Sequence, residues 1–218
     1  MSTTTTLPGT VVQRPQGLSL LATLAIVGQL VLLASALLLP IWSQYSLIRD
    51  NISELALGRY GFLQIAAFVL AGLGTLALAF VIRQLTKGSW GSRVGSLLVG
   101  VYGAGAILSA VFPTDRIDSG ADLSSLSATG TIHIGVAFVS FLSVIVGMFV
   151  LSQTFAQERG WGSFWRLSVF FPAGALALII VQQEGPLIGL LQRALVTVIS
   201  AWLILVALRA RSIVTPGQ

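Results

Sequence analysis

Residues 112–133 read FPTDRIDSGADLSSLSATGTIH, a polar and acidic stretch that ends on the only histidine of the chain, His133. Long apolar segments flank it, residues 94–112 before it and residues 131–151 after it. A helix of about 20 apolar residues crosses the roughly 30 Å of hydrocarbon in a bilayer. The stretch is therefore predicted to be a loop where two membrane-spanning helices surface on the same side of a bilayer.

The composition of the whole chain is that of a membrane protein. Of its 218 residues 55% are hydrophobic and only 9% are charged, with a mean hydropathy of +0.92. Soluble domains carry about 25% charged residues, so a lipid bilayer is the expected partner. The net charge of +5 arises from basic residues in short loops and not from basic and aromatic residues interleaved, which argues against nucleic-acid binding. The chain has no cysteine, which excludes disulfides and thiolate chemistry.

Six apolar segments are long enough to be spans. They cover residues 18–39, 60–82, 94–112, 131–151, 167–183 and 187–208. The predicted fold is all-α, a six-transmembrane-helix bundle forming one membrane domain over residues 18–209, between cytoplasmic tails at residues 1–17 and 210–218. The first tail is rich in Thr, Pro and Gly and is expected to be disordered. Within the spans, Gln29 is expected to bond a neighbouring helix, and Pro172 to kink the fifth span.

Basic residues are distributed unevenly between the two sides of such a bundle. Six spans place both termini on one side, and cytoplasmic loops are the ones enriched in Lys and Arg. Both termini are therefore predicted to be cytoplasmic, because their side holds eight of the 12 Lys and Arg residues: Arg14, Arg83, Lys87, Arg93, Arg159, Arg166, Arg209 and Arg211. Every acidic residue except Glu158 then lies on the opposite side.

Two ionisable residues on that opposite side lie close to hydrocarbon. His133 begins the fourth span, and Arg193 lies about 10 Å inside the sixth at 1.5 Å per residue. Such groups are costly in a membrane unless they pair with each other or line a wet cavity. Arg193 is therefore expected to have an anionic partner, and the candidates are Glu184, Glu54 and Asp115.

Three short motifs resemble the signatures of one family. They are Ile52-Ser53-Glu54-Leu55 followed by Gly58, Phe112-Pro113-Thr114-Asp115 followed by His133, and Leu190-Leu191-Gln192-Arg193. In their order and placement they resemble the family called domain of unknown function 998. The resemblance implies a multi-pass protein of the prokaryotic inner membrane with no established activity. It draws attention to Ser53, Glu54, Pro113, Thr114, Asp115, His133 and Arg193.

The first functional hypothesis is a site that binds or transports a small polar ligand or a lipid head group. Arg193 would hold a phosphate or carboxylate, because a guanidinium matches such anions with two parallel hydrogen bonds. The other ligand-binding candidates are Glu54, Glu184 and Thr114. Transport is the less favoured form, since little except Gln29 and Pro172 lies deep in the spans.

The second hypothesis is a membrane-embedded hydrolase or transferase that acts on lipid-linked substrates. His133 would be the general base, Asp115 would orient its imidazole, and Ser53 or a water would attack. No sequence pattern places Ser53 within reach of His133.

A third interpretation gives these residues no site at all. They would form an ion-pair and hydrogen-bond network that joins the helix ends, with Glu54 bonding back to Asn51 as in a helix cap. A metal held by Glu54, Asp115 and His133 would suit Mn²⁺ or Zn²⁺ only loosely, because no cysteine and no closely spaced ligand pair accompany the histidine, so no metal site is predicted. No cofactor is predicted either, since one histidine gives a haem at most one axial ligand.

Overall fold

The computed structural model describes residues 16–86, 88–116, 126–181 and 185–215. Within these ranges the chain is helical and contains no strand. The long helices are α1 (Gln16–Ser43), α2 (Gly61–Leu85), α3 (Trp90–Val111), α4 (Ala128–Gln157), α6 (Phe170–Val181) and α7 (Ile188–Val214). Short elements complete the set: the 3₁₀ helices η1 (Ser53–Leu57) and η3 (Arg159–Trp161), and α5 (Phe164–Ser168).

Among the described residues, six helical segments are long and apolar enough to cross a membrane. They are α1, α2, α3, α4, the combined segment Phe164–Val181, and α7. The predicted all-α, six-span fold is therefore confirmed, and the chain is a multi-pass membrane protein. The cytoplasmic location of the two termini stays a prediction.

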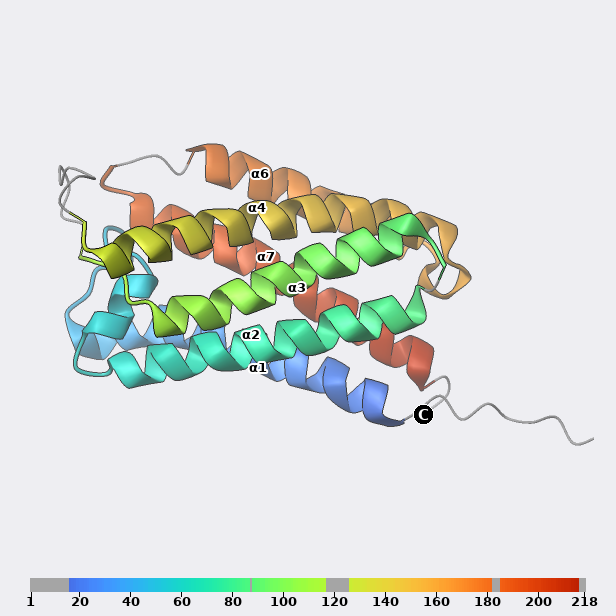
Figure 1. Cartoon of the computed structure of the whole chain (residues 1–218), viewed down its shortest axis with the longest axis horizontal. Helices are drawn as coiled ribbons and strands as arrows, with labels where there is room; N and C mark the ends of the chain where they lie inside the picture. Colours follow the sequence, from blue (N-terminus) through green and yellow to red (C-terminus); the bar gives the residue numbers. More distant parts are fainter. Residues whose placement is uncertain (1–15, 87, 117–125, 182–184, 216–218) are drawn as a thin grey trace, which may run out of the picture.

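The spans run side by side along the long axis of the molecule, and the described chain begins and ends at the same end of the bundle (Figure 1). We call this the Arg83 end, because α2 finishes there at Arg83 to Leu85. The opposite end holds η1, the start of α4 and the start of α7, and we call it the His133 end (Figure 1).

The Arg83 end has a large aromatic core. Trp161 stacks on Phe155 with ring centroids 3.9 Å apart, and both side chains are almost completely buried. Trp202 of α7 donates from Nε1 to Ser168 Oγ at 2.8 Å. This hydroxyl also bonds Ser152 of α4, so these three polar side chains are paired across three helical elements.

The His133 end has a core of smaller side chains, which lets helices approach closely. Its buried apolar residues are Leu32, Ala36, Ile52, Ala67, Ala71 and Val196. α1 crosses α2 at Gly28, where an added Cβ would lie 2.5 Å from the Leu70 carbonyl oxygen. Close contact of small residues is the usual way that membrane helices associate, since lipid gives no hydrophobic drive between them.

The helices extend beyond several of the expected span ends: α4 ends at Gln157 and α7 at Val214, where residues 151 and 208 were expected. Two further differences involve a proline. α1 continues through Pro40 to Ser43, instead of ending at residue 39. The fifth span is divided at Val169 into α5 and α6, with Pro172 in the first turn of α6. A proline is tolerated there because the N–H groups of a first turn have no partner within the helix.

Candidate functional site

Arg193 is held by backbone carbonyls from three segments of the His133 end. Its Nε donates to Ala36 O of α1 at 3.1 Å, and its Nη1 donates to Asp50 O at 2.6 Å and to Gly189 O at 3.0 Å. The side chain is 5% exposed. Arg193 therefore fastens α7 both to α1 and to the connection between α1 and α2.

The bond to Ala36 has a specific cause in the sequence. Pro40 lies four residues after Ala36 inside α1 and has no N–H, so the Ala36 carbonyl loses its ordinary helical donor. Within a membrane such a carbonyl needs another donor, because water is absent. Arg193 is that donor, and this explains how α1 can continue through a proline to Ser43.

In the described part of the chain, the hydrogen bonds of Arg193 go to carbonyl oxygens, while the charges of Asp50 and Glu54 act on it without a direct bond. Nε makes one of these bonds and Nη1 makes two, and no described atom bonds Nη2. Glu184, one of the expected partners and ligand-binding candidates, lies outside the described residues. A ligand role for Arg193 stays a prediction.

Glu54 lies in η1 and bonds back to the residue where the turn begins. Its Oε1 accepts from Asn51 N at 3.3 Å and from Asn51 Nδ2 at 3.1 Å, and the side chain is 2% exposed. Burial raises the pKa of Glu54 above its ordinary value, and the charge of Asp50 adds to this, while the bonds from Asn51 and the charge of Arg116 act in the other direction. The geometry agrees with the capping alternative for Glu54.

We expect Glu54→Gln to be more stable than the wild type at pH 7.5, with a difference that shrinks toward pH 4.5. The pKa of Glu54 is higher in the folded protein than its ordinary value of 4.5. Below pH 4.5 the acid is protonated in both states, and its contribution to stability is complete. This contribution is lost as the pH rises through the pKa of Glu54 in the folded protein. Glutamine is neutral throughout and keeps the acceptor for Asn51. Unfolding titrations of both proteins at the two pH values measure this, and parallel pH profiles would contradict it.

Asp115 organises the start of α4. Its Oδ2 accepts from Ser127 N at 2.7 Å and its Oδ1 from Ser127 Oγ at 2.8 Å, while Ser127 Oγ accepts from Gly130 N at 3.0 Å as the helix cap. The carboxylate lies directly against Gly130, where a side chain would collide with it. Thr114 is buried next to it, and its hydroxyl donates to Asp115 O at 3.2 Å.

His133 bonds a backbone carbonyl through one ring nitrogen. Its Nδ1 lies 2.8 Å from Phe112 O, so Nδ1 carries the proton and donates it. In the neutral imidazole this leaves Nε2 as an acceptor. The described bonds of Asp115 go to Ser127 and not to this ring, so the Phe112 carbonyl orients His133. The role of Asp115 in catalysis stays a prediction.

A small cavity adjoins His133 at this end of the bundle. It offers about 60 Å³ of space, enough for a few water molecules or part of a larger ligand. Its polar lining includes His133, Ser53 of η1 and Gln192 of α7. The structure thus brings together two of the predicted catalytic residues, His133 and Ser53, whereas Arg193, Glu54, Asp115 and Thr114 are not among the lining residues.

Gln192 also lines the cavity, although it is not among the site residues predicted from the sequence. Its Oε1 accepts from Ile52 N at 2.6 Å, which attaches α7 to the start of η1 and leaves the amide nitrogen as a donor. The available signal was its place beside Arg193 in the third motif. Gln29, expected to bond a neighbouring helix, joins two: its Nε2 donates to Thr75 Oγ1 at 3.0 Å and its Oε1 accepts from Ser200 Oγ at 2.8 Å.

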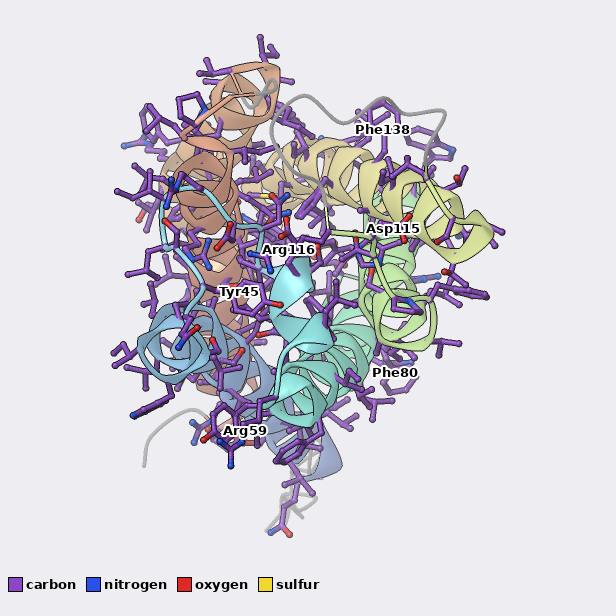
Figure 2. All side chains as sticks on the ribbon, turned by 90° about the vertical axis from the view of Figure 1, so that its left-hand side faces the viewer. Tyr45, Arg59, Phe80, Asp115, Arg116 and Phe138 are labelled. Atoms are coloured by element: carbon purple, nitrogen blue, oxygen red, sulfur yellow. The ribbon has the colours of Figure 1, made fainter. Side chains whose placement is uncertain are left out.

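Figure 2 views the bundle from the His133 end, where Arg116 and Tyr45 face the viewer. Arg116 and Tyr45 come together beside η1, at the centre of the ring of helices (Figure 2), with Arg116 Cζ 5.4 Å from the Tyr45 ring centroid. This cation–π contact joins the segment after α3 to the segment after α1.

Comparison with known proteins gives one match. The model of a protein family described as "Protein of unknown function (DUF998)" matches residues 11–209 of the chain. No curated protein and no solved structure matches it. The matched range contains the first five spans, most of α7 and the three motifs.

Proposed function

The chain belongs to the DUF998 family of multi-pass membrane proteins, and on this premise we propose that its His133-end cavity binds the polar end of an amphipathic molecule. The observation that carries the proposal is the shared cavity of His133, Ser53 and Gln192. The resulting function is ligand binding within the membrane and not bulk transport.

The cavity is lined by polar side chains near the His133 end and farther along by mostly apolar ones, with Ser140 and Tyr102 among them. Ser53, His133 and Gln192 belong to η1 or to the first two turns of their helices. Phe141 and Val196, which also line the cavity, lie farther along α4 and α7. From His133 to Phe141 the helix advances about 12 Å at 1.5 Å per residue. A polar group near the His133 end with an apolar chain directed inward suits this lining.

The chemistry of the polar lining favours an uncharged group. The side chains offer an imidazole nitrogen, a hydroxyl and an amide nitrogen. A hydroxyl, ester or amide of the ligand can bond all three kinds, whereas a phosphate or carboxylate would need a cation in the cavity lining. The ligand is therefore a lipid-like alcohol, ester or amide, instead of the anion first expected at Arg193.

Hydrolysis of an ester is the second candidate, and the specific observation in its favour is that Ser53 and His133 line one cavity. Ser53 Oγ would attack the acyl carbon, and its proton would pass to His133 Nε2, with Phe112 O holding Nδ1–H. The bond to the alcohol oxygen would break, and the alcohol would leave with the proton from Nε2. Water, deprotonated by the same nitrogen, would then attack the acyl group, releasing the acid and restoring the Ser53 hydroxyl. Mass spectrometry of lipids bound to wild type and His133→Ala separates the two functions. A binder loses its ligand in the variant, whereas a hydrolase accumulates an intact ester there.

We expect Ala137→Trp to reduce the co-purified ligand roughly tenfold or more, which corresponds to about 1.4 kcal/mol of binding. Ala137 lines the cavity, so an indole at this position occupies the ligand volume. The matched control is Gly135→Trp, on the same helix but exposed and with no atom within 4 Å of an added Cβ. Lipid mass spectrometry of the purified proteins measures the retained ligand. Equal retention by both variants would contradict the proposal.

A further inference from the structure

A second hollow lies at the Arg83 end, on the outside of the bundle between α2 and α3. It is a groove of about 480 Å³, lined on the α2 side by Leu76, Ala79, Phe80 and Arg83, and on the α3 side by Arg93, Ser96, Leu97, Gly100, Val101 and Ala104. Phe80 and Leu97 are exposed, and Phe80 projects from the outer face of the bundle (Figure 2). The groove therefore opens toward the surrounding lipid, unlike the His133 cavity inside the bundle.

Both charged residues of the groove are arginines near the connection between α2 and α3. Arg83 is in the last turn of α2 and Arg93 in the first turn of α3. Arg83 is half-buried and its Nη1 reaches Ser92 Oγ at 3.4 Å, while Arg93 is exposed. No acidic side chain lines the groove in the described part of the chain. Two guanidinium groups without an acid favour an anion, and phosphate is the anion whose geometry they fit.

Ser96 provides independent evidence for a ligand. It lies three residues after Arg93, at the boundary between the basic and the apolar parts of the groove. The side chain is 6% exposed, and its hydroxyl has no hydrogen-bond partner among the described residues. A buried hydroxyl without a partner is uncommon in proteins and costs free energy, so a bound oxygen acceptor accounts for it.

The floor of the groove leaves room for a chain. Small residues of α3, at Ser96, Gly100, Gly103 and Ala104, face α2 or the groove. At Gly103 the two helices are in contact, and an added Cβ would lie 2.9 Å from Gly72 O. At Gly100 the nearest atoms to an added Cβ, from Leu76 and Ala79, are 3.9 Å away. The helices therefore touch at Gly103 and are farther apart at Gly100, which lines the groove.

We propose that this groove binds an anionic phospholipid. The phosphate lies between Arg83 and Arg93, Ser96 donates to an ester oxygen, and one acyl chain follows the floor past Gly100 to Ala104. From Arg93 to Ala104 is about 16 Å at 1.5 Å per residue, which is close to half of the roughly 30 Å hydrocarbon thickness. The groove thus has the length of one leaflet, with its basic end at the height of the head groups.

The test uses the full chain in lipid nanodiscs, with native mass spectrometry of the lipids that remain bound. Phosphatidylglycerol is the anionic probe and phosphatidylcholine the zwitterionic one. The double variant Arg83→Gln/Arg93→Gln is expected to retain roughly tenfold less phosphatidylglycerol, equivalent to about 1.4 kcal/mol, with little change for phosphatidylcholine. The matched control is Arg59→Gln at the other end of the bundle, which keeps both lipids.

A second variant tests the same groove in case the double arginine variant fails to fold. Gly100→Leu blocks the floor of the groove without removing a charge, and it is expected to lower retention of phosphatidylglycerol as well. Equal retention of the two lipids by the wild type, or equal loss in the Arg59 control, would overturn the proposal. So would a dimer of the wild type that Gly100→Leu dissociates, because a second copy of the chain would then occupy the groove. None of these outcomes depends on the His133 cavity.

Discussion

Replacing Arg193 with methionine is expected to lower the free energy of unfolding by about 3–5 kcal/mol, near the upper limit for a single substitution. The variant keeps an apolar side chain of similar length but removes every donor. Three carbonyls then lose a bond to a charged group, each worth about 1.5–3 kcal/mol before relaxation. Unfolding of the purified protein in mixed micelles, followed by circular dichroism, measures the change.

Pro40 supplies the control for this prediction. In Pro40→Ala the new N–H can donate to Ala36 O, so one of the groups served by Arg193 no longer needs it. Arg193→Met is therefore expected to cost less in the Pro40→Ala background, with a coupling of about 0.5–3 kcal/mol between the two positions. An identical cost in both backgrounds would contradict the assignment of Arg193 to the carbonyl freed by Pro40.

Gly28→Ala is expected to destabilise the fold by about 3 kcal/mol, at the upper end of the range for overpacked cores. The three atoms nearest to the added Cβ are all backbone atoms of α2: Leu70 O at 2.5 Å, Leu70 C at 3.0 Å and the Cα of Ala71 at 3.1 Å. No side chain can rotate away, so the two helices must separate. The separation also strains the bond from Gln29 to Thr75.

Gly135→Ala is the matched control, because Gly135 is an exposed helical glycine with no atom within 4 Å of the added Cβ. Alanine is the better helix former, so this variant is expected to be unchanged or more stable by about 0.5–1 kcal/mol. The same micelle titration compares the two. A similar loss of stability at both positions would show that helix packing at Gly28 is not the cause.

The six spans could be predicted from the sequence because a bilayer imposes one strong rule: about 20 apolar residues in a row. The two differences that involve a proline have local causes that a window of hydropathy does not contain. α1 continues past Pro40 because a donor from α7, 153 residues later in the chain, replaces the missing bond. α5 and α6 separate at Val169, where the first turn that accommodates Pro172 begins.

The site was predictable only in part. That Arg193 must be satisfied follows from the cost of charge in a membrane, but its partners could not be read from residue types, because every residue carries a carbonyl. Asp115 and His133 belong to the same motif, but they do not bond each other. Asp115 accepts from Ser127, and His133 bonds Phe112 O. These partners depend on how the backbone leaves α3 and enters α4, which the residue types do not reveal. Gln192 was missed because its contact with Ile52 depends on how α7 meets η1.

The central claim is that the His133 end of the bundle holds a ligand among His133, Ser53 and Gln192. The most direct measurement is a cryo-electron microscopy map of the protein in nanodiscs made from native membrane lipid. Our account predicts density that begins within hydrogen-bond distance of His133 Nε2 and continues toward Phe141. A well-resolved map in which this space is closed by the side chains of α4 and α7, with no density between them, would contradict it.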